Sequence, residues 1–136
     1  MTDLDWEEVV GGTLTPVFGA LRAVIPLLKD GSNIVVVGSI VGSVGGFGCA
    51  NYAAAKAGLI GMVKTWAREL GRKGIRANAV CPGFIATSIL GTIPERVLRA
   101  LEAKVPMGRL GKPEEIANTF AWLASDEASY INGAVI

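Results

Sequence analysis

Residues 34–57, IVVVGSIVGSVGGFGCANYAAAKA, decide the fold. The apolar run Ile34–Val37 leads into Gly38 and Ser39, a glycine-rich stretch follows, and good helix formers begin near Tyr52. Apolar, mostly β-branched residues bounded by glycine are typical of a strand that is buried on both faces, as in a parallel sheet. On a helix, Tyr52 and Lys56 are four residues apart and therefore project from the same face. This stretch predicts a strand end with a hydroxyl beside a helix with a phenol and an ammonium.

Such an arrangement suits proton transfer. A Lys cation close to a phenol stabilises the phenolate, so that the Tyr can exchange protons nearer neutral pH. The Ser39 hydroxyl can hydrogen-bond the oxygen of a carbonyl or alcohol beside that phenol. An ordinary amphipathic helix with a surface Lys and a half-buried Tyr has the same spacing, and such pairs are common by chance. The rest of the chain has to decide between these two interpretations.

The segments downstream predict an α/β fold. The helix that carries Tyr52 is expected to end at Gly71 or Gly74, and residues 75–81, IRANAVC, have the pattern of a second buried strand. A later helix is expected from Glu114 to Ala124, with an apolar stripe along one side. The order strand, helix, strand predicts a parallel sheet with helices between its strands.

A largely apolar segment extends over residues 5–28, DWEEVVGGTLTPVFGALRAVIPLL. It is long enough to raise the question of a membrane helix. Arg22 near its middle and the prolines Pro16 and Pro26 argue against that interpretation. A soluble helix, buried against a sheet and a partner subunit, is favoured instead. Pro16 removes a backbone donor, so a kink is expected there.

Composition excludes several classes of protein. An apolar content of 51% over 136 residues suits one globular unit, residues 1–136. The net charge is +1 and no basic stripe interleaves with aromatics, so no nucleic-acid partner is predicted. Cys49 and Cys81 lack CxxC spacing and no signal-peptide pattern precedes Asp3, which together predict a reduced, cytoplasmic setting. Histidine is absent, which excludes a hydrolase mechanism based on a Ser-His pair and most kinds of zinc site. No metal site is predicted.

Five motifs follow one another along the chain: Gly38-Ser39, NYAAAKAG at residues 51–58, NAVCPGFIAT at 78–87, PMGRLGKPEE at 106–115 and LASD at 123–126. In this order and at these separations they resemble the short-chain dehydrogenase/reductase family. Ser39 lies thirteen residues before Tyr52, the spacing seen in that family's bacterial 3-oxoacyl-carrier-protein reductase branch. The resemblance covers nearly all of the chain.

The resemblance implies a Rossmann-like, doubly wound parallel sheet and an NAD(P)-dependent oxidoreductase of fatty acid biosynthesis type, which reduces a carbonyl such as a 3-oxoacyl thioester. It implies three catalytic residues: Ser39 orients the carbonyl, Tyr52 is the general acid, and Lys56 assists Tyr52 and binds the cofactor ribose. The cofactor is expected to be NADP or NAD, with NADP favoured by the resemblance alone. A small carbonyl substrate, carried on acyl carrier protein in the leading hypothesis, and a homodimer or homotetramer are also implied.

The resemblance further implies that the loop after the second predicted strand lies against the nicotinamide. Residues 39–51 are expected to be a loop around the substrate pocket, since they lack the G-x-G-x-x-G pattern of a nucleotide turn, although their apolar side chains would serve equally well as core fillers. Residues 88–105 are expected to form a lid in which Ile89 and Leu90 set selectivity. The predicted cofactor-binding residues are Tyr52, Lys56, Pro82, Gly83, Ile85 and Thr87, and the predicted substrate-binding residues are Ser39, Ile40, Val41, Phe47 and Phe84.

The chain departs from the family pattern in two ways. Thr13 stands where the family usually places an Asn that holds a water in the proton relay. The Thr-Gly-x-x-x-Gly-x-Gly loop and the residue that selects NAD or NADP have no counterpart, so an incomplete Rossmann-like domain with an unpaired sheet edge is expected. Two hypotheses remain open. One is the oxidoreductase, acting on a 3-oxoacyl thioester or on another ketone or secondary alcohol; the other is a catalytically silent fragment or assembly-only partner.

Overall fold

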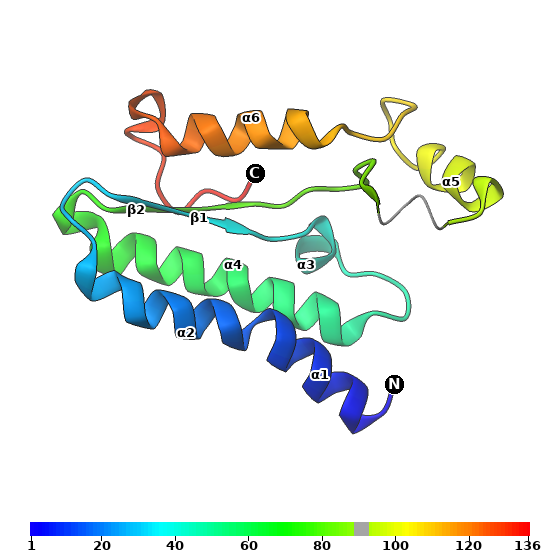
Figure 1. Cartoon of the computed structure of the whole chain (residues 1–136), viewed down its shortest axis with the longest axis horizontal. Helices are drawn as coiled ribbons and strands as arrows, with labels where there is room; N and C mark the ends of the chain where they lie inside the picture. Colours follow the sequence, from blue (N-terminus) through cyan, green and yellow to red (C-terminus); the bar gives the residue numbers. More distant parts are fainter. Residues whose placement is uncertain (89–92) are drawn as a thin grey trace.

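The computed structural model describes residues 1–88 and 93–136, which form helical layers on both sides of a small sheet (Figure 1). The helices and strands are α1 (Asp3–Thr13), α2 (Thr15–Val24), β1 (Asn33–Val37), α3 (Ile40–Val44), α4 (Ala50–Leu70), β2 (Arg76–Val80), α5 (Glu95–Glu102) and α6 (Pro113–Ala124), with short 3-10 turns at Ile25–Leu27, Gly71–Lys73 and Asp126–Ala128. α2 and α4 lie on one side of the sheet and α6 on the other. The predicted α/β class is confirmed.

The two strands run parallel, with Asn33 opposite Arg76 and Val37 opposite Val80. Because the strands are in register, their carboxyl ends meet at one edge of the sheet, where ligands bind in open α/β folds. Within the described residues β1 has one strand neighbour, so its other long edge is open. Residues 34–37 and 75–81, predicted as strands from their β-branched, apolar pattern, therefore bring the turns that follow them together.

α4 forms the centre of the core. Its buried residues recur every three or four positions, which gives the helix one continuous apolar side. That side packs against Ile34 and Val36 of β1 and against Ala77 and Ala79 of β2. Burial of this stripe is the main stabilising contribution on this face of the sheet. The buried α4 residues are Asn51, Ala55, Leu59, Ile60, Val63, Trp66, Ala67 and Leu70.

α6 covers the opposite face and is anchored at its carboxyl end. The buried guanidinium of Arg76 donates hydrogen bonds to the carbonyls of Leu123 at 2.9 Å and Ser125 at 3.1 Å. The Asn33 side-chain amide donates to the Ala124 carbonyl at 3.1 Å. These contacts satisfy carbonyl groups that the helix leaves free, and the cation lies at the negative end of the helix dipole.

The N-terminal helical segment is interrupted next to Pro16, where a kink was expected. It is divided at Leu14, which ends α1 and precedes α2, and Pro16 occupies the first turn of α2. Pro16 has no N–H to donate to the carbonyl four residues earlier, so the chain restarts a helix there. Thr2 caps α1, with its hydroxyl accepting from the Asp5 amide and the Asp5 carboxylate accepting from the Thr2 amide.

Among the described residues, Asp3–Leu27 is the one helical stretch that is long and apolar enough to cross a membrane by length and composition. No residue of its most apolar part is fully buried in the single chain, although one side packs on the core as predicted; burial against a partner subunit stays a prediction. Leu14, Val17 and Leu21 are half-buried on the core, whereas Phe18 and Leu27 face outward. The segment therefore presents an apolar outer face.

One further segment differs from expectation. Residues 39–51 were expected to form a loop, but α3 occupies part of this stretch because Ser39 caps its first turn. Residues 133–136 run parallel to β2: the Gly133 amide donates to the Ala77 carbonyl at 2.8 Å and the Ala79 amide to the Ala134 carbonyl at 2.9 Å, beside the bridge between Ala79 and Val135. The expected lid contains α5, while Ile89 and Leu90 lie outside the described residues.

Candidate active site

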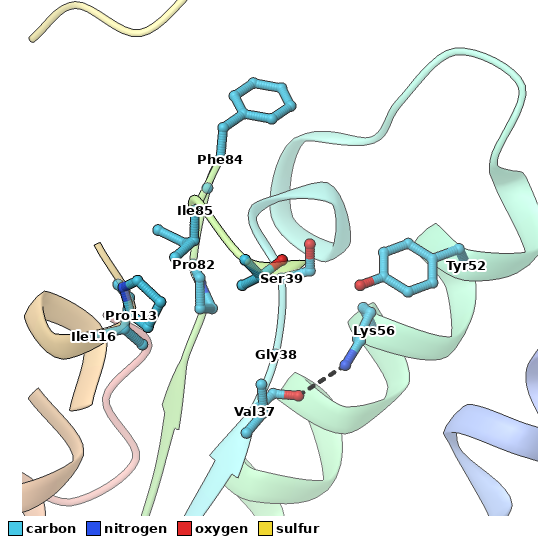
Figure 2. Close-up of a pocket in the computed structure, with 12 residues that line it drawn as sticks. Val37, Gly38, Ser39, Tyr52, Lys56, Pro82, Phe84, Ile85, Pro113 and Ile116 are labelled. Carbon is cyan, nitrogen blue, oxygen red and sulfur yellow. Dashed lines mark hydrogen bonds between the residues drawn. The ribbon is translucent and has the colours of Figure 1, made fainter. Parts of the chain in front are cut away.

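A cavity of about 540 Å³ opens at the carboxyl ends of β1 and β2. Its walls come from the ends of both strands, from α4, from the loop after β2 and from the start of α6, as Figure 2 shows. Segments far apart in the sequence thus meet around one space. The lining residues are Val37, Gly38, Ser39, Tyr52, Lys56, Pro82, Gly83, Phe84, Ile85, Thr87, Pro113 and Ile116.

Ser39 lies two residues after the end of β1 and caps α3. Its Oγ accepts a hydrogen bond from the Val41 amide at 3.2 Å, and the residue is 8% exposed. The next amide, that of Ile40, donates to the Pro82 carbonyl at 3.1 Å, which joins the turn after β1 to the turn after β2. The serine hydroxyl is an acceptor in its capping bond, so its own proton remains available for a ligand oxygen.

Tyr52 and Lys56 extend from the first turns of α4 toward the end of β1, where Ser39 lies (Figure 2). The Lys56 Nζ lies 5.7 Å from the centroid of the Tyr52 ring and donates to the Val37 carbonyl at 3.0 Å. Tyr52 is 36% exposed, so its phenol is open to solvent or to a ligand. The predicted four-residue spacing therefore places a cation beside a phenol at the cavity wall.

The environment of Lys56 lowers its pKa below the usual value, because partial burial penalises the ammonium; the neighbouring Cys81 acts in the opposite direction. Lowered pKa values of partly buried lysines are frequent at catalytic sites, since the charged form is then easily exchanged with the neutral one. The Val37 carbonyl offsets part of this burial by accepting one of the three ammonium protons.

The loop after β2 is fixed against the start of α6. The Gly111 amide donates to the Phe84 carbonyl at 3.0 Å and the Ala86 amide to the Gly111 carbonyl at 2.8 Å. Arg109 then pairs in a bidentate manner with Glu115, at 2.8 and 2.6 Å. The Arg109 hydrogen bonds, followed by the Lys112 amide, lower the pKa of the Glu115 carboxyl to about 2. This network brings α6 to the cavity.

The structure brings most of the predicted site residues together. Ser39, Tyr52 and Lys56 line the cavity, and so do Pro82, Gly83, Ile85 and Thr87, predicted to bind the cofactor, together with Phe84. Ile40, Val41 and Phe47, predicted to bind substrate, do not line it. α3 turns Ile40 outward, and Phe47 is fully exposed. The functional roles of all these residues remain predictions.

Four cavity residues were not singled out as site residues from the sequence: Val37, Gly38, Pro113 and Ile116. Val37 and Gly38 end a predicted parallel strand, and that position is the signal that could have identified them. Pro113 and Ile116 carry no local signal, because they reach the cavity only through the pairing of Gly111 with the loop after β2.

Thr13 lines a second groove, which it shares with Val37 and Lys56. The groove runs along the open edge of β1, beside α2. Thr13 and Lys56 therefore line the same groove, and the resemblance places the water of the proton relay at the position of Thr13.

Comparison with known proteins identifies the family of this chain. The family described as enoyl-(acyl carrier protein) reductase matches residues 1–136. The 3-oxoacyl-[acyl-carrier-protein] reductase FabG of Thermotoga maritima is 48% identical, with 100% of this chain and 56% of the relative aligned. Human (3R)-3-hydroxyacyl-CoA dehydrogenase is 43% identical, with 100% of this chain and 53% of the relative aligned. Estradiol 17-beta-dehydrogenase 8 of Callithrix jacchus is 46% identical over 96% of this chain and 99% of the relative.

The chain spans about half the length of the T. maritima and human relatives. The family match, in contrast, covers every residue of the chain. These relatives are reductases and dehydrogenases by name. The chain belongs to the short-chain dehydrogenase/reductase family.

Proposed function

We propose that this chain is the catalytic half of an NAD(P)-dependent reductase that converts a carbonyl, in the first place a 3-oxoacyl thioester, to the corresponding alcohol. The observation that carries the proposal is the convergence of Ser39, Tyr52 and Lys56 on one cavity at the carboxyl ends of two parallel strands. The substrate class follows the T. maritima and human relatives, whose names specify 3-oxoacyl and 3-hydroxyacyl groups.

The three side chains divide the proton chemistry between them. The Ser39 hydroxyl donates a hydrogen bond to the substrate carbonyl oxygen and holds that oxygen beside the phenol of Tyr52. Tyr52 gives its proton to the oxygen as the carbonyl becomes a hydroxyl. The Lys56 ammonium stabilises the phenolate left behind, since the two groups lie side by side on α4. Solvent at the exposed edge of Tyr52 returns the proton.

The cavity fits the nicotinamide end of the cofactor in chemistry. Val37, Pro82, Ile85 and Ile116 give apolar walls for a planar ring. Among the described residues Lys56 uses one of its donors on the Val37 carbonyl, which leaves two for ribose hydroxyls. The Ile85 backbone and the Thr87 hydroxyl are then the groups that would bind the carboxamide or phosphates. When bound, the cofactor supplies the hydride.

Titration calorimetry of the purified chain with NADPH and NADH, tested separately, is the first experiment. Saturable binding that weakens by about 10-fold or more in Lys56→Ala, as expected for loss of a hydrogen bond from a charged group, supports the proposal. Lys64→Ala is the matched control, because Lys64 lies on the same helix but outside the cavity, and it should bind as the wild type does.

Assays with a 3-oxoacyl thioester and with an enoyl thioester then define the reaction. Turnover of the 3-oxoacyl substrate that is lost in Tyr52→Phe supports carbonyl reduction. A folded chain that binds neither cofactor up to about 1 mM contradicts the proposal and favours the silent, assembly-only alternative. Turnover of the enoyl substrate alone would replace the proposed reaction with the one in the family's description.

We also propose that the chain assembles with copies of itself through α1, α2 and the outer side of α4. Apolar side chains that are exposed in the single chain support this, among them Trp6, Phe18 and Leu27. Sedimentation analysis should give a dimer or tetramer, and Phe18→Glu should shift it toward the monomer. A wild-type chain that is monomeric at about 0.1 mM contradicts the proposal. The cytoplasmic setting stays a prediction.

A further inference from the structure

We propose that Gly42 is a positioning residue: its missing side chain lets α3 rest on the backbone of α4 at Lys56, and this contact sets the spacing of Ser39 from Tyr52 and Lys56. The inference rests on the proposed function and deepens it, because it names a residue outside the catalytic three that determines their geometry. Gly42 does not itself line the cavity.

The contact is unusually close. A Cβ at Gly42 would lie 2.8 Å from the carbonyl carbon and Cβ of Lys56 and 2.9 Å from the Ala57 amide nitrogen. Carbon atoms in contact prefer separations of roughly 3.5–4.0 Å, so an added methyl group would have to move the two helices apart by about 1 Å. The obstructing atoms belong to the middle of a helical turn and cannot rotate away.

Other glycines in the described part of the chain differ from Gly42 in this respect. At Gly58 the nearest atoms are the flexible end of Leu14, and at Gly61 there is open space. At Gly38 and Gly46 the nearest atoms are cysteine sulfurs. Among the described glycines, Gly42 is the one at which a Cβ would come within 3.0 Å of main-chain atoms. A residue without a side chain is therefore needed at position 42 for α3 and α4 to pack this closely.

Movement of α3 would reach Ser39 directly. Ser39 caps α3, and the Gly42 amide donates to the Ser39 carbonyl at 2.9 Å, so that both residues belong to the same turn. On the other side of the contact, Lys56 carries the ammonium and Tyr52 lies one turn earlier on α4. Figure 2 shows Ser39 at the turn after β1 and the side chains of Tyr52 and Lys56 on α4, so the spacing between them depends on how α3 packs against α4.

Kinetics of Gly42→Ala test the inference. A displacement of about 1 Å at a reacting group can cost about 100-fold, so we expect kcat to fall by about 10- to 100-fold while KM changes by less than about threefold. Gly61→Ala, at an exposed position of α4 with open space around it in the single chain, is the matched control; with wild-type assembly confirmed by sedimentation, it should keep the wild-type kcat. A folded Gly42→Ala protein with a kcat within about threefold of wild type overturns the proposal.

A double-mutant cycle separates positioning from general destabilisation. If Gly42 acts through Ser39, then Gly42→Ala should have little further effect on kcat in a Ser39→Ala background. Equal fold-losses in both backgrounds would mean that Gly42 acts elsewhere, and would overturn the proposal.

Two readouts do not depend on activity. Crystal structures of wild type and Gly42→Ala should differ by a shift of α3 relative to α4, and nuclear Overhauser effects should connect the Gly42 α-protons with the Lys56 and Ala57 amides in the wild type. Absence of these effects refutes the contact even if Gly42→Ala does not fold. If the wild type shows the contact but neither binds cofactor nor turns over, the proposed function fails while the helix spacing stands.

Discussion

Replacement of Asn78 by alanine should destabilise the protein more than its small volume suggests. Asn78 lies in the middle of β2 and is fully buried. Its Nδ2 donates to the Ile131 carbonyl at 2.8 Å, and its Oδ1 accepts from the Ala134 amide at 2.9 Å. One side chain thus satisfies two backbone groups of the C-terminal segment, more than fifty residues away in the sequence.

The magnitude follows from these two bonds. A buried hydrogen bond contributes about 0.5–1.5 kcal/mol net, and a buried group left without its partner costs about 1–3 kcal/mol. For two such groups we expect Asn78→Ala to lower the free energy of unfolding by about 2–4 kcal/mol, a large part of the roughly 5–15 kcal/mol typical of a domain.

Urea unfolding, followed by tryptophan fluorescence, measures the change, with Asn118→Ala as the control because Asn118 is exposed on α6. Amide exchange should also accelerate at Ala134 before it does in the core, since the C-terminal segment loses its anchor first. A loss below about 0.5 kcal/mol, equal to that of the control, would refute the assignment of this stability to the Asn78 amide.

Three further predictions follow from the same structure. Leu59→Ala, at the centre of the core, should lower the free energy of unfolding by about 2–5 kcal/mol in urea titration, whereas the exposed Met107→Ala should change it by less than about 0.5 kcal/mol. The folded-state pKa of Glu115 is lowered by Arg109 to about 2 from the usual 4.5. The stability that this carboxylate contributes is therefore present above pH 4.5 and is lost as the pH falls toward 2. The difference in the free energy of unfolding between wild type and Glu115→Gln should shrink over that range, and a difference that is constant with pH contradicts this. Thr13→Asn should raise kcat without changing KM, since an amide adds two donors near Lys56 for a relay water, and an unchanged kcat would remove Thr13 from the relay.

The local pattern of the sequence predicted the elements that carry the site. The β-branched run before Gly38 is a parallel strand, Pro16 divides the N-terminal helix, and Tyr52 and Lys56 share one side of α4. Each of these depends on backbone geometry over a few residues, namely strand alternation, a missing amide proton and helical periodicity, so that neighbouring residues are sufficient to specify it.

Tertiary structure decided the rest. The short helix α3 formed inside an expected loop because Ser39 caps it and Gly42 lets it rest on α4, and this turned Ile40 and Phe47 away from the cavity. Pro113 and Ile116 reach the cavity through backbone pairing between Gly111 and the loop after β2. Close packing and long-range hydrogen bonds depend on residues far apart in the chain, so they cannot be predicted from the spacing of neighbouring residues. The sequence by itself determined which chemical groups are available, and the packing of α3, α4 and α6 determined which of them meet.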